Sequence, residues 1–223
     1  MSQRISHSVL DPIIFPMVPR LYRAMRISRR IPPEAIVVSG HVVAIAGAVG
    51  FAFSTHYWWA GLIAAAGVAG NHIADMVDGT HARSTGQCRN GGELLDHFTD
   101  PLSFAYWMIG LGAAAGSLAL ALAAVIAIFA TAVLTNIKAK MTGRFTLARF
   151  GPTEFKALLT VYALVLTAVT WLVPEHTVTV ALGTFAALTA ALVIQLIVNL
   201  ITAIREVNRD DATAVDTTDW QLQ

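Results

Sequence analysis

Four aspartates stand in two pairs in a sequence that is otherwise largely apolar: Asp75 with Asp78, and Asp96 with Asp100. Residues three or four apart lie on one face of a helix, so each pair would present two carboxylates from one side. A short connection between two such helices would bring the pairs together. Four carboxylates in one place repel one another unless cations lie between them, and carboxylate oxygens suit Mg²⁺, Mn²⁺ or Ca²⁺. The spacing therefore predicts a metal site with two metal ions.

Glycines and one arginine flank the aspartate pairs. Gly79 directly follows Asp78, and Gly91 and Gly92 precede the second pair. Glycine lets a ligand approach where a side chain would block it. Arg83, one helical turn beyond Gly79, can neutralise a phosphate or fix a carboxylate. Because two cations can bridge diphosphate oxygens and stabilise a leaving phosphate, these features suit a diphosphate ligand, with one carboxylate free to take a proton from an attacking hydroxyl.

The composition is that of a polytopic membrane protein. Hydrophobic residues make up 56% of the 223 residues and charged residues 13%, whereas about a quarter of an ordinary soluble domain is charged. The net charge of +1 says little by itself, and no signal peptide is evident. The single cysteine, Cys88, excludes an intrachain disulfide. We expect no nucleic acid among the partners.

Six apolar runs follow one another along the chain. Each approaches or exceeds the ~20 residues that a helix needs to cross a bilayer, and the separators between them are short. The sequence therefore predicts an all-α membrane protein with six transmembrane helices. The predicted spans are residues 34–54, 57–83, 91–113, 117–141, 154–173 and 177–204.

The positive charges test this topology. If the N-terminus is inside, the first, third and fifth connections are outside, and none of these contains Lys or Arg. All fifteen Lys and Arg lie in the N-terminal zone, around residues 83–89, in the stretch 138–156, or at Arg205 and Arg209. This is the positive-inside pattern. We expect a multi-pass protein with both termini in the cytoplasm, in the cell membrane of a prokaryote.

The two ends of the chain differ from the apolar middle. Residues 1–33 combine prolines and arginines with apolar side chains, which favours a basic amphipathic helix in the membrane interface over a disordered basic tail. Residues 34–204 would form the six-helix catalytic domain. Residues 205–223 are polar, with several aspartates, and predict a solvated cytoplasmic tail.

The acidic stretch is similar to a known motif. The pattern D-x2-D-G-x2-A-R-x8-G-x3-D-x3-D is the signature of the CDP-alcohol phosphotransferases, also called CDP-alcohol phosphatidyltransferases, and residues 75–100 carry it without departure. The resemblance extends more loosely over the whole chain. It implies transfer of a substituted phosphate from a CDP-linked donor to an alcohol, with release of CMP. It also implies a homodimer.

The resemblance assigns roles by position. Asp75, Asp78 and Asp96 would be metal ligands, and Asp100 would be both a ligand and the general base. The cofactors would be two divalent cations, Mg²⁺ or Mn²⁺. The positions that would bind CDP are Asp75, Asp78, Gly79, Ala82, Arg83 and Gly92.

The acceptor side is less defined. A polar and basic cluster ends the fourth span and continues into the next loop, and it could bind a phosphate on one substrate or simply anchor the protein to anionic headgroups. Its members are Asn136, Lys138, Lys140, Arg144 and Arg149. Glu154 would either begin the fifth span as a first-turn acid or help to order the acceptor pocket.

The segment 92–97, with the sequence GELLDH, resembles the choline and ethanolamine phosphotransferase branch. That branch transfers from a CDP-amino alcohol to diacylglycerol. In the alternative branches, CDP-diacylglycerol is the donor and a polar alcohol such as glycerol phosphate, inositol phosphate, inositol or serine is the acceptor.

Other classes of function remain to be compared. A metal-ion transporter should place acids near the bilayer midplane on several helices, whereas these acids gather at one end of a helix pair. Interfacial loop charges without a function would show no particular spacing. A membrane phosphatase would use the same site with water in place of the alcohol, and CMP release that requires an added alcohol would separate the two enzymes.

Overall fold

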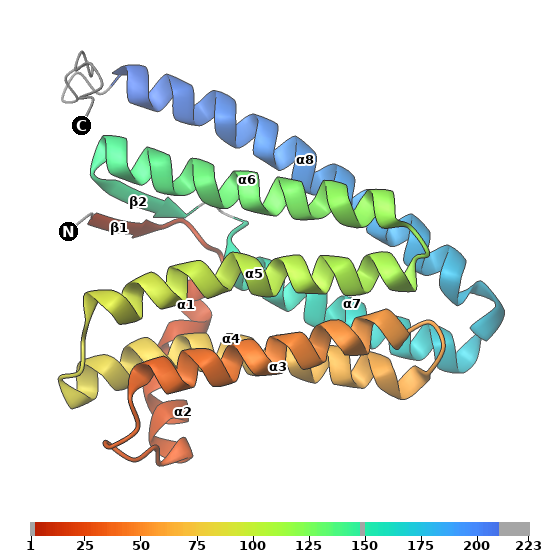
Figure 1. Ribbon diagram of the computed structural model, residues 1–223, viewed down its shortest axis with the longest axis horizontal. Coiled ribbons are helices and arrows are strands. Elements are labelled where there is room, and N and C mark those ends of the chain that lie inside the picture. Colours follow the sequence, from red (N-terminus) through yellow and green to blue (C-terminus); the bar gives the residue numbers. More distant parts are fainter. Residues whose placement is uncertain (1–2, 148–149, 210–223) are drawn as a thin grey trace, which may run out of the picture.

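The computed structural model describes residues 3–147 and 150–209. In this part of the chain, six long helices lie side by side in one bundle (Figure 1). This architecture confirms the predicted all-α membrane fold. The six helices are α3 (Pro33–Phe53), α4 (Trp58–Thr85), α5 (Asn90–Ala114), α6 (Leu118–Thr142), α7 (Pro152–Leu172) and α8 (Thr177–Arg209).

Five segments of the described chain are long and apolar enough to cross a membrane: α3, α4, α6, α7, and the stretch Pro174–Arg209, in which the short 3-10 helix η2 (Pro174–His176) precedes α8. Helix α5 has a similar length but contains no stretch that is apolar enough, because its first half carries Glu93, Asp96 and Asp100. It packs against α3 on one side and α6 on the other. A multi-pass protein is therefore supported, and the sixth span remains a prediction.

Helices α3 and α4 pack with their backbones close together. A Cβ atom added at Gly47 would lie 3.0 Å from the Cα of Gly67, and one added at Gly50 would lie 2.5 Å from the backbone nitrogen of Ala64. In addition, the buried indole of Trp107 on α5 donates to the carbonyl oxygen of Ala44 at 2.9 Å. Small residues at helix contacts are typical of membrane proteins, where close packing replaces the hydrophobic drive for association.

Left-handed glycines end two helices at the end of the bundle where the aspartates lie. Helix α4 ends at Gly86, with φ of 73°, and α6 ends at Gly143, with φ of 68°. Residues with a side chain adopt this conformation only at a cost, so glycine is the usual helix terminator of this kind. Gly86 thus turns the chain from the first aspartate pair back toward the second.

The N-terminal zone is built from short pieces rather than one helix. They are strand β1 (Gln3–Ser6), α1 (Asp11–Ile14), the 3-10 helix η1 (Phe15–Met17) and α2 (Val18–Met25). Each helical piece has a proline in its first turn, where proline is tolerated, whereas further inside it would break the helix. The fully buried His81 of α4 anchors this zone. Its two ring nitrogens form hydrogen bonds with the hydroxyl of Tyr22 and the backbone carbonyl of Ile31, each at 2.8 Å.

A small sheet was not predicted. Strand β1 pairs in parallel with β2 (Arg144–Leu147), so that Gln3 lies opposite Arg144. The pairing joins the start of the chain to the loop after α6 (Figure 1). Arg149 and residues 210–223 lie outside the described residues. The polar tail was predicted as residues 205–223, and its first residues are helical because α8 continues through Arg209.

Glu154 holds the N-terminal zone against the start of α7. One of its carboxylate oxygens accepts from the Ser8 hydroxyl at 2.5 Å and from the backbone N–H groups of Val9 and Leu10 at 2.8 and 3.1 Å. The other oxygen accepts from the backbone N–H of Gly151 at 2.9 Å, which caps the helix. Of the two roles that the sequence suggests for Glu154, the structure places it as the first-turn acid, with a long-range role in addition.

Removing this carboxylate should release the N-terminal zone. In a Glu154→Ala variant we expect the amides of Val9, Leu10 and Gly151 to exchange hydrogen at least about tenfold faster, because a bond to a charged acceptor contributes about 1.5–3 kcal/mol. Hydrogen exchange followed by mass spectrometry measures this. Glu175→Ala, at an exposed position in η2, is the control. Unchanged hydrogen exchange at residues 8–10 would show that Glu154 does not hold the N-terminal zone against α7.

Candidate metal centre

Three of the four aspartates come together where α4 ends and α5 begins. Asp75 lies in the third-last turn of α4, and Asp96 and Asp100 lie in the first turns of α5. One carboxylate oxygen from each residue can be chosen so that all three lie within 4.8 Å of one another. Two helices therefore supply three oxygen ligands to one small volume, as the spacing in the sequence predicts for a helix pair.

Asp78 occupies a different position in the same region. It follows Asp75 by about one turn, its side chain is buried, and it accepts a hydrogen bond from the backbone N–H of Gly79. Its oxygens are not part of the three-carboxylate group among the described residues. The predicted four-carboxylate cluster is thus a group of three with a fourth carboxylate beside it.

Lys156 of α7 contacts the aspartates. The sequence analysis assigned it no role beyond membership of the basic stretch 138–156. Its ammonium nitrogen donates to Asp75 Oδ2 at 2.8 Å and to Asp100 Oδ1 at 3.2 Å. The side chain is 1% exposed, and the ammonium lies 5.5 Å from the centre of the Phe104 ring. A lysine in an apolar helix needs a partner, and this requirement is the signal that could have identified it.

The carboxylate oxygens fit a divalent cation. Asp75 and Asp100 keep 26% and 28% of their side chains exposed although Lys156 is buried, so part of each carboxylate side chain stays accessible. An all-carboxylate donor set suits hard cations such as Mg²⁺. One turn before Asp75, both ring nitrogens of His72 are buried and lack a hydrogen-bond partner within the described chain. Buried polar atoms are normally satisfied, so water or a ligand group is expected beside them.

The residues at the predicted CDP positions lie along the same two helix ends. A Cβ added at Gly79 would lie 3.3 Å from Nη1 of Arg83, so glycine leaves room for the exposed guanidinium to cross the helix surface. Ala82 lies between these two on α4 and is partly exposed. On α5, a Cβ at Gly92 would lie 3.5 Å from Oε1 of Glu34. Gly79 and Gly92 therefore leave space beside the carboxylates that a side chain would occupy.

The candidate acceptor residues are not joined to the aspartates. Lys138 forms an ion pair with Glu206 of α8, and the exposed amide of Asn136 donates to the carbonyl of Ala132 in its own helix. Lys140 and Arg144 are exposed. Within the described residues, no hydrogen bond or ion pair links these four side chains to the carboxylate group. The structure thus gives Lys138 a structural partner rather than a place in the centre.

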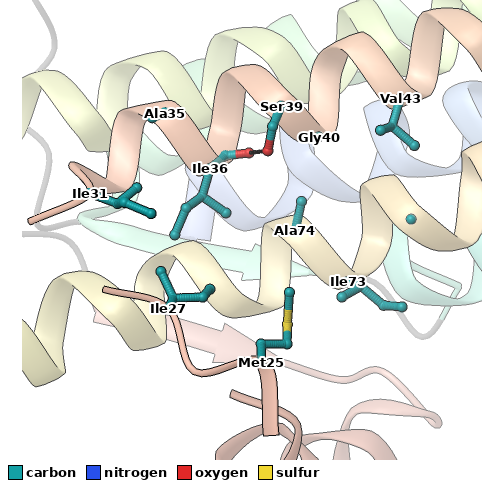
Figure 2. Close-up of a pocket in the computed structure, with 11 residues that line it drawn as sticks. Met25, Ile27, Ile31, Ala35, Ile36, Ser39, Gly40, Val43, Ile73 and Ala74 are labelled. Atoms are coloured by element: carbon teal, nitrogen blue, oxygen red, sulfur yellow. Dashed lines mark hydrogen bonds between the residues drawn. The ribbon is translucent and has the colours of Figure 1, made fainter. Parts of the chain in front are cut away.

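A separate groove lies between α3, α4 and the chain that joins α2 to α3. Its volume is about 520 Å³, and among the described residues that line it only Ser39 has a polar side chain (Figure 2). Ile73 and Ala74 of α4 contribute to it, next to Asp75 in sequence but with no carboxylate in the lining. The groove suits an apolar group, and it is distinct from the polar centre.

Comparison with protein families identifies the family of the chain. The sequence model of the family described as CDP-alcohol phosphatidyltransferase matches residues 31–205, which run from just before α3 to near the end of α8. No curated protein matches the sequence significantly. The matched range includes every residue of the three-carboxylate group, Asp78 and Lys156.

Proposed function

The chain belongs to the CDP-alcohol phosphatidyltransferase family, and we propose that the aspartates at the joint of α4 and α5 are its reaction centre. Members are membrane transferases of substituted phosphate groups, which use a CDP-linked donor, an alcohol acceptor and divalent cations. The observation that carries the proposal is the meeting of Asp75, Asp96 and Asp100 within 4.8 Å. Membership of an enzyme family removes the transporter alternative.

We assign the cation ligands to Asp75, Asp78, Asp96 and Asp100, with two Mg²⁺ or Mn²⁺ ions as the cofactors. When bound, such ions neutralise diphosphate oxygens and polarise the phosphorus that is attacked. The exposed Arg83 would hold a phosphate of the donor. Gly79, Ala82 and Gly92 would leave space for the nucleotide beside the two helix ends.

The chemical step needs a base next to the attacking hydroxyl. We propose Asp100, whose carboxylate is partly exposed and is held by Lys156. Asp100 would accept the proton as the alcohol oxygen bonds to phosphorus and the bond from phosphorus to the CMP oxygen breaks. A carboxylate fixed by a buried lysine stays in one orientation, which helps it meet the hydroxyl.

For the substrates, we propose a CDP-amino alcohol donor and a diacylglycerol acceptor. The sequence of segment 92–97 supports this pair. Lys138, one of the candidate acceptor residues, is already paired with Glu206. The alternative remains CDP-diacylglycerol with a polar alcohol. We further propose that the centre opens to the cytoplasm, that both termini lie there, and that the enzyme is a homodimer.

Release of CMP by the purified protein in lipid tests the function. With Mg²⁺ or Mn²⁺ present, we expect CMP from CDP-choline or CDP-ethanolamine only when diacylglycerol is added, and none after addition of EDTA. A parallel set would contain CDP-diacylglycerol with glycerol phosphate, inositol phosphate, inositol or serine. Turnover in that set alone would overturn the substrate pair, and CMP release without any alcohol would indicate a hydrolase.

A further inference from the structure

Lys156 brings a permanent positive charge to a centre that also has to hold divalent cations. We propose that Lys156 is a positioning residue, the resident counter-ion of the aspartates. It holds Asp75 and Asp100 together when no divalent cation is bound, and it lowers the negative charge that the cations must neutralise. The inference rests on the proposed metal site and adds a residue outside the family motif at positions 75–100.

The contacts of Lys156 link three helices. The lysine comes from α7, Asp75 from α4 and Asp100 from α5, and the two hydrogen bonds of 2.8 and 3.2 Å join all three. Helix α7 also packs along α4, so closely that a Cβ added at Gly61 would lie 2.8 Å from the backbone oxygen of Ala163. The ammonium is therefore delivered by a rigid element of the bundle rather than by a loop.

The lysine and the aspartates differ in exposure. Lys156 is 1% exposed, whereas Asp75 and Asp100 each keep more than a quarter of their side chains exposed. The ammonium is thus part of the interior, while the exposed part of the carboxylates is accessible to a cation. Both can be present together, so the lysine acts as a fixed part of the centre.

Charge balance predicts what happens without the lysine. A buried ion pair that loses one partner leaves an uncompensated charge, which is strongly destabilising. In a Lys156→Met variant the aspartates would repel one another until a divalent cation took over the neutralisation. The variant should therefore depend on metal for its stability far more than the natural protein does.

Thermal unfolding of the detergent-purified protein tests this, measured in EDTA and across a Mg²⁺ titration. In EDTA we expect the Tm of Lys156→Met to fall by on the order of 10 °C. Saturating Mg²⁺ should restore most of that loss. The Mg²⁺ concentration at half of the full Tm shift should be about tenfold lower than in the natural protein, because the centre is more negative.

Two further variants separate charge from packing. Leu159→Ala removes a buried side chain from the same helix without changing charge, and its loss of Tm should be the same in EDTA and in Mg²⁺. The double variant Lys156→Met/Asp100→Asn removes one charge of each sign. In EDTA it should be more stable than Lys156→Met alone, which also keeps the test possible if the single variant folds poorly.

The outcomes distinguish this inference from the proposed function. If Lys156→Met loses the same Tm with and without Mg²⁺, or loses none, the lysine is not the counter-ion although the metal site stands. If Mg²⁺ and Mn²⁺ change the Tm of neither the natural protein nor any variant, the metal site itself is wrong and the inference fails with it. A metal-dependent loss confined to Lys156→Met supports it.

Discussion

Asparagine in place of Asp100 should lower the rate of CMP release by roughly a thousandfold or more while the protein stays folded. Asparagine has the same shape as aspartate, but its amide cannot take a proton from the acceptor hydroxyl and carries no negative charge for a cation. The fold should persist because the amide oxygen can still accept from Lys156, which also keeps Asp75 as a partner. Both the base and the ligand functions of the residue are lost in one substitution.

The measurement is CMP release at saturating donor, acceptor and Mg²⁺, together with Tm to show that the variant is folded. Asp11→Asn is the control, since Asp11 is a hydrogen-bonded aspartate outside the carboxylate group: it is buried and accepts from Thr153 at 2.8 Å. Its rate should stay within about threefold of the natural protein. An Asp100→Asn enzyme that keeps more than a tenth of the activity would exclude Asp100 as the base.

The second large effect concerns the fold. Isoleucine at Gly50 should prevent α3 and α4 from packing and leave little or no folded protein. A Cβ at this position would lie 2.5 Å from the backbone nitrogen of Ala64 and 2.8 Å from the backbone oxygen of Ala60. Backbone atoms of a helix cannot move aside as a side chain can, so the two helices would have to separate. Overpacking alone costs about 1–3 kcal/mol, and lost contact between the helices adds to it.

The yield of monodisperse protein after purification and its Tm measure this effect. Gly183→Ile provides the control, because a Cβ at Gly183 on α8 meets no atom of the described residues within 4 Å. The control should be obtained in normal yield with a Tm within about 2 °C of the natural protein. A Gly50→Ile variant that is equally stable would show that the α3–α4 contact is looser than the structure has it.

The sequence by itself determined the helices and the meeting of Asp75 with Asp96 and Asp100, but not the separate position of Asp78. Helix α4 was predicted as residues 57–83 and spans Trp58–Thr85, and α5 was predicted as residues 91–113 and spans Asn90–Ala114. Apolar length and helical periodicity are local properties, so they can be read from consecutive residues. Asp75 lies in the last three turns of α4 and Asp96 in the first two turns of α5, so the short connection through Gly86 was enough to place them together.

Only the tertiary structure decided which other residues reach the centre. Lys156 lies 81 residues from Asp75 and 56 from Asp100 along the chain, and its role depends on which face of α7 meets α4. The same holds for Glu154 against Ser8, for β1 against β2, and for Lys138 against Glu206. No local pattern encodes such pairs, because they follow from how six apolar helices rotate and pack against one another. The sequence therefore predicted where the candidate centre lies, and the packing of the bundle brought Lys156 to it.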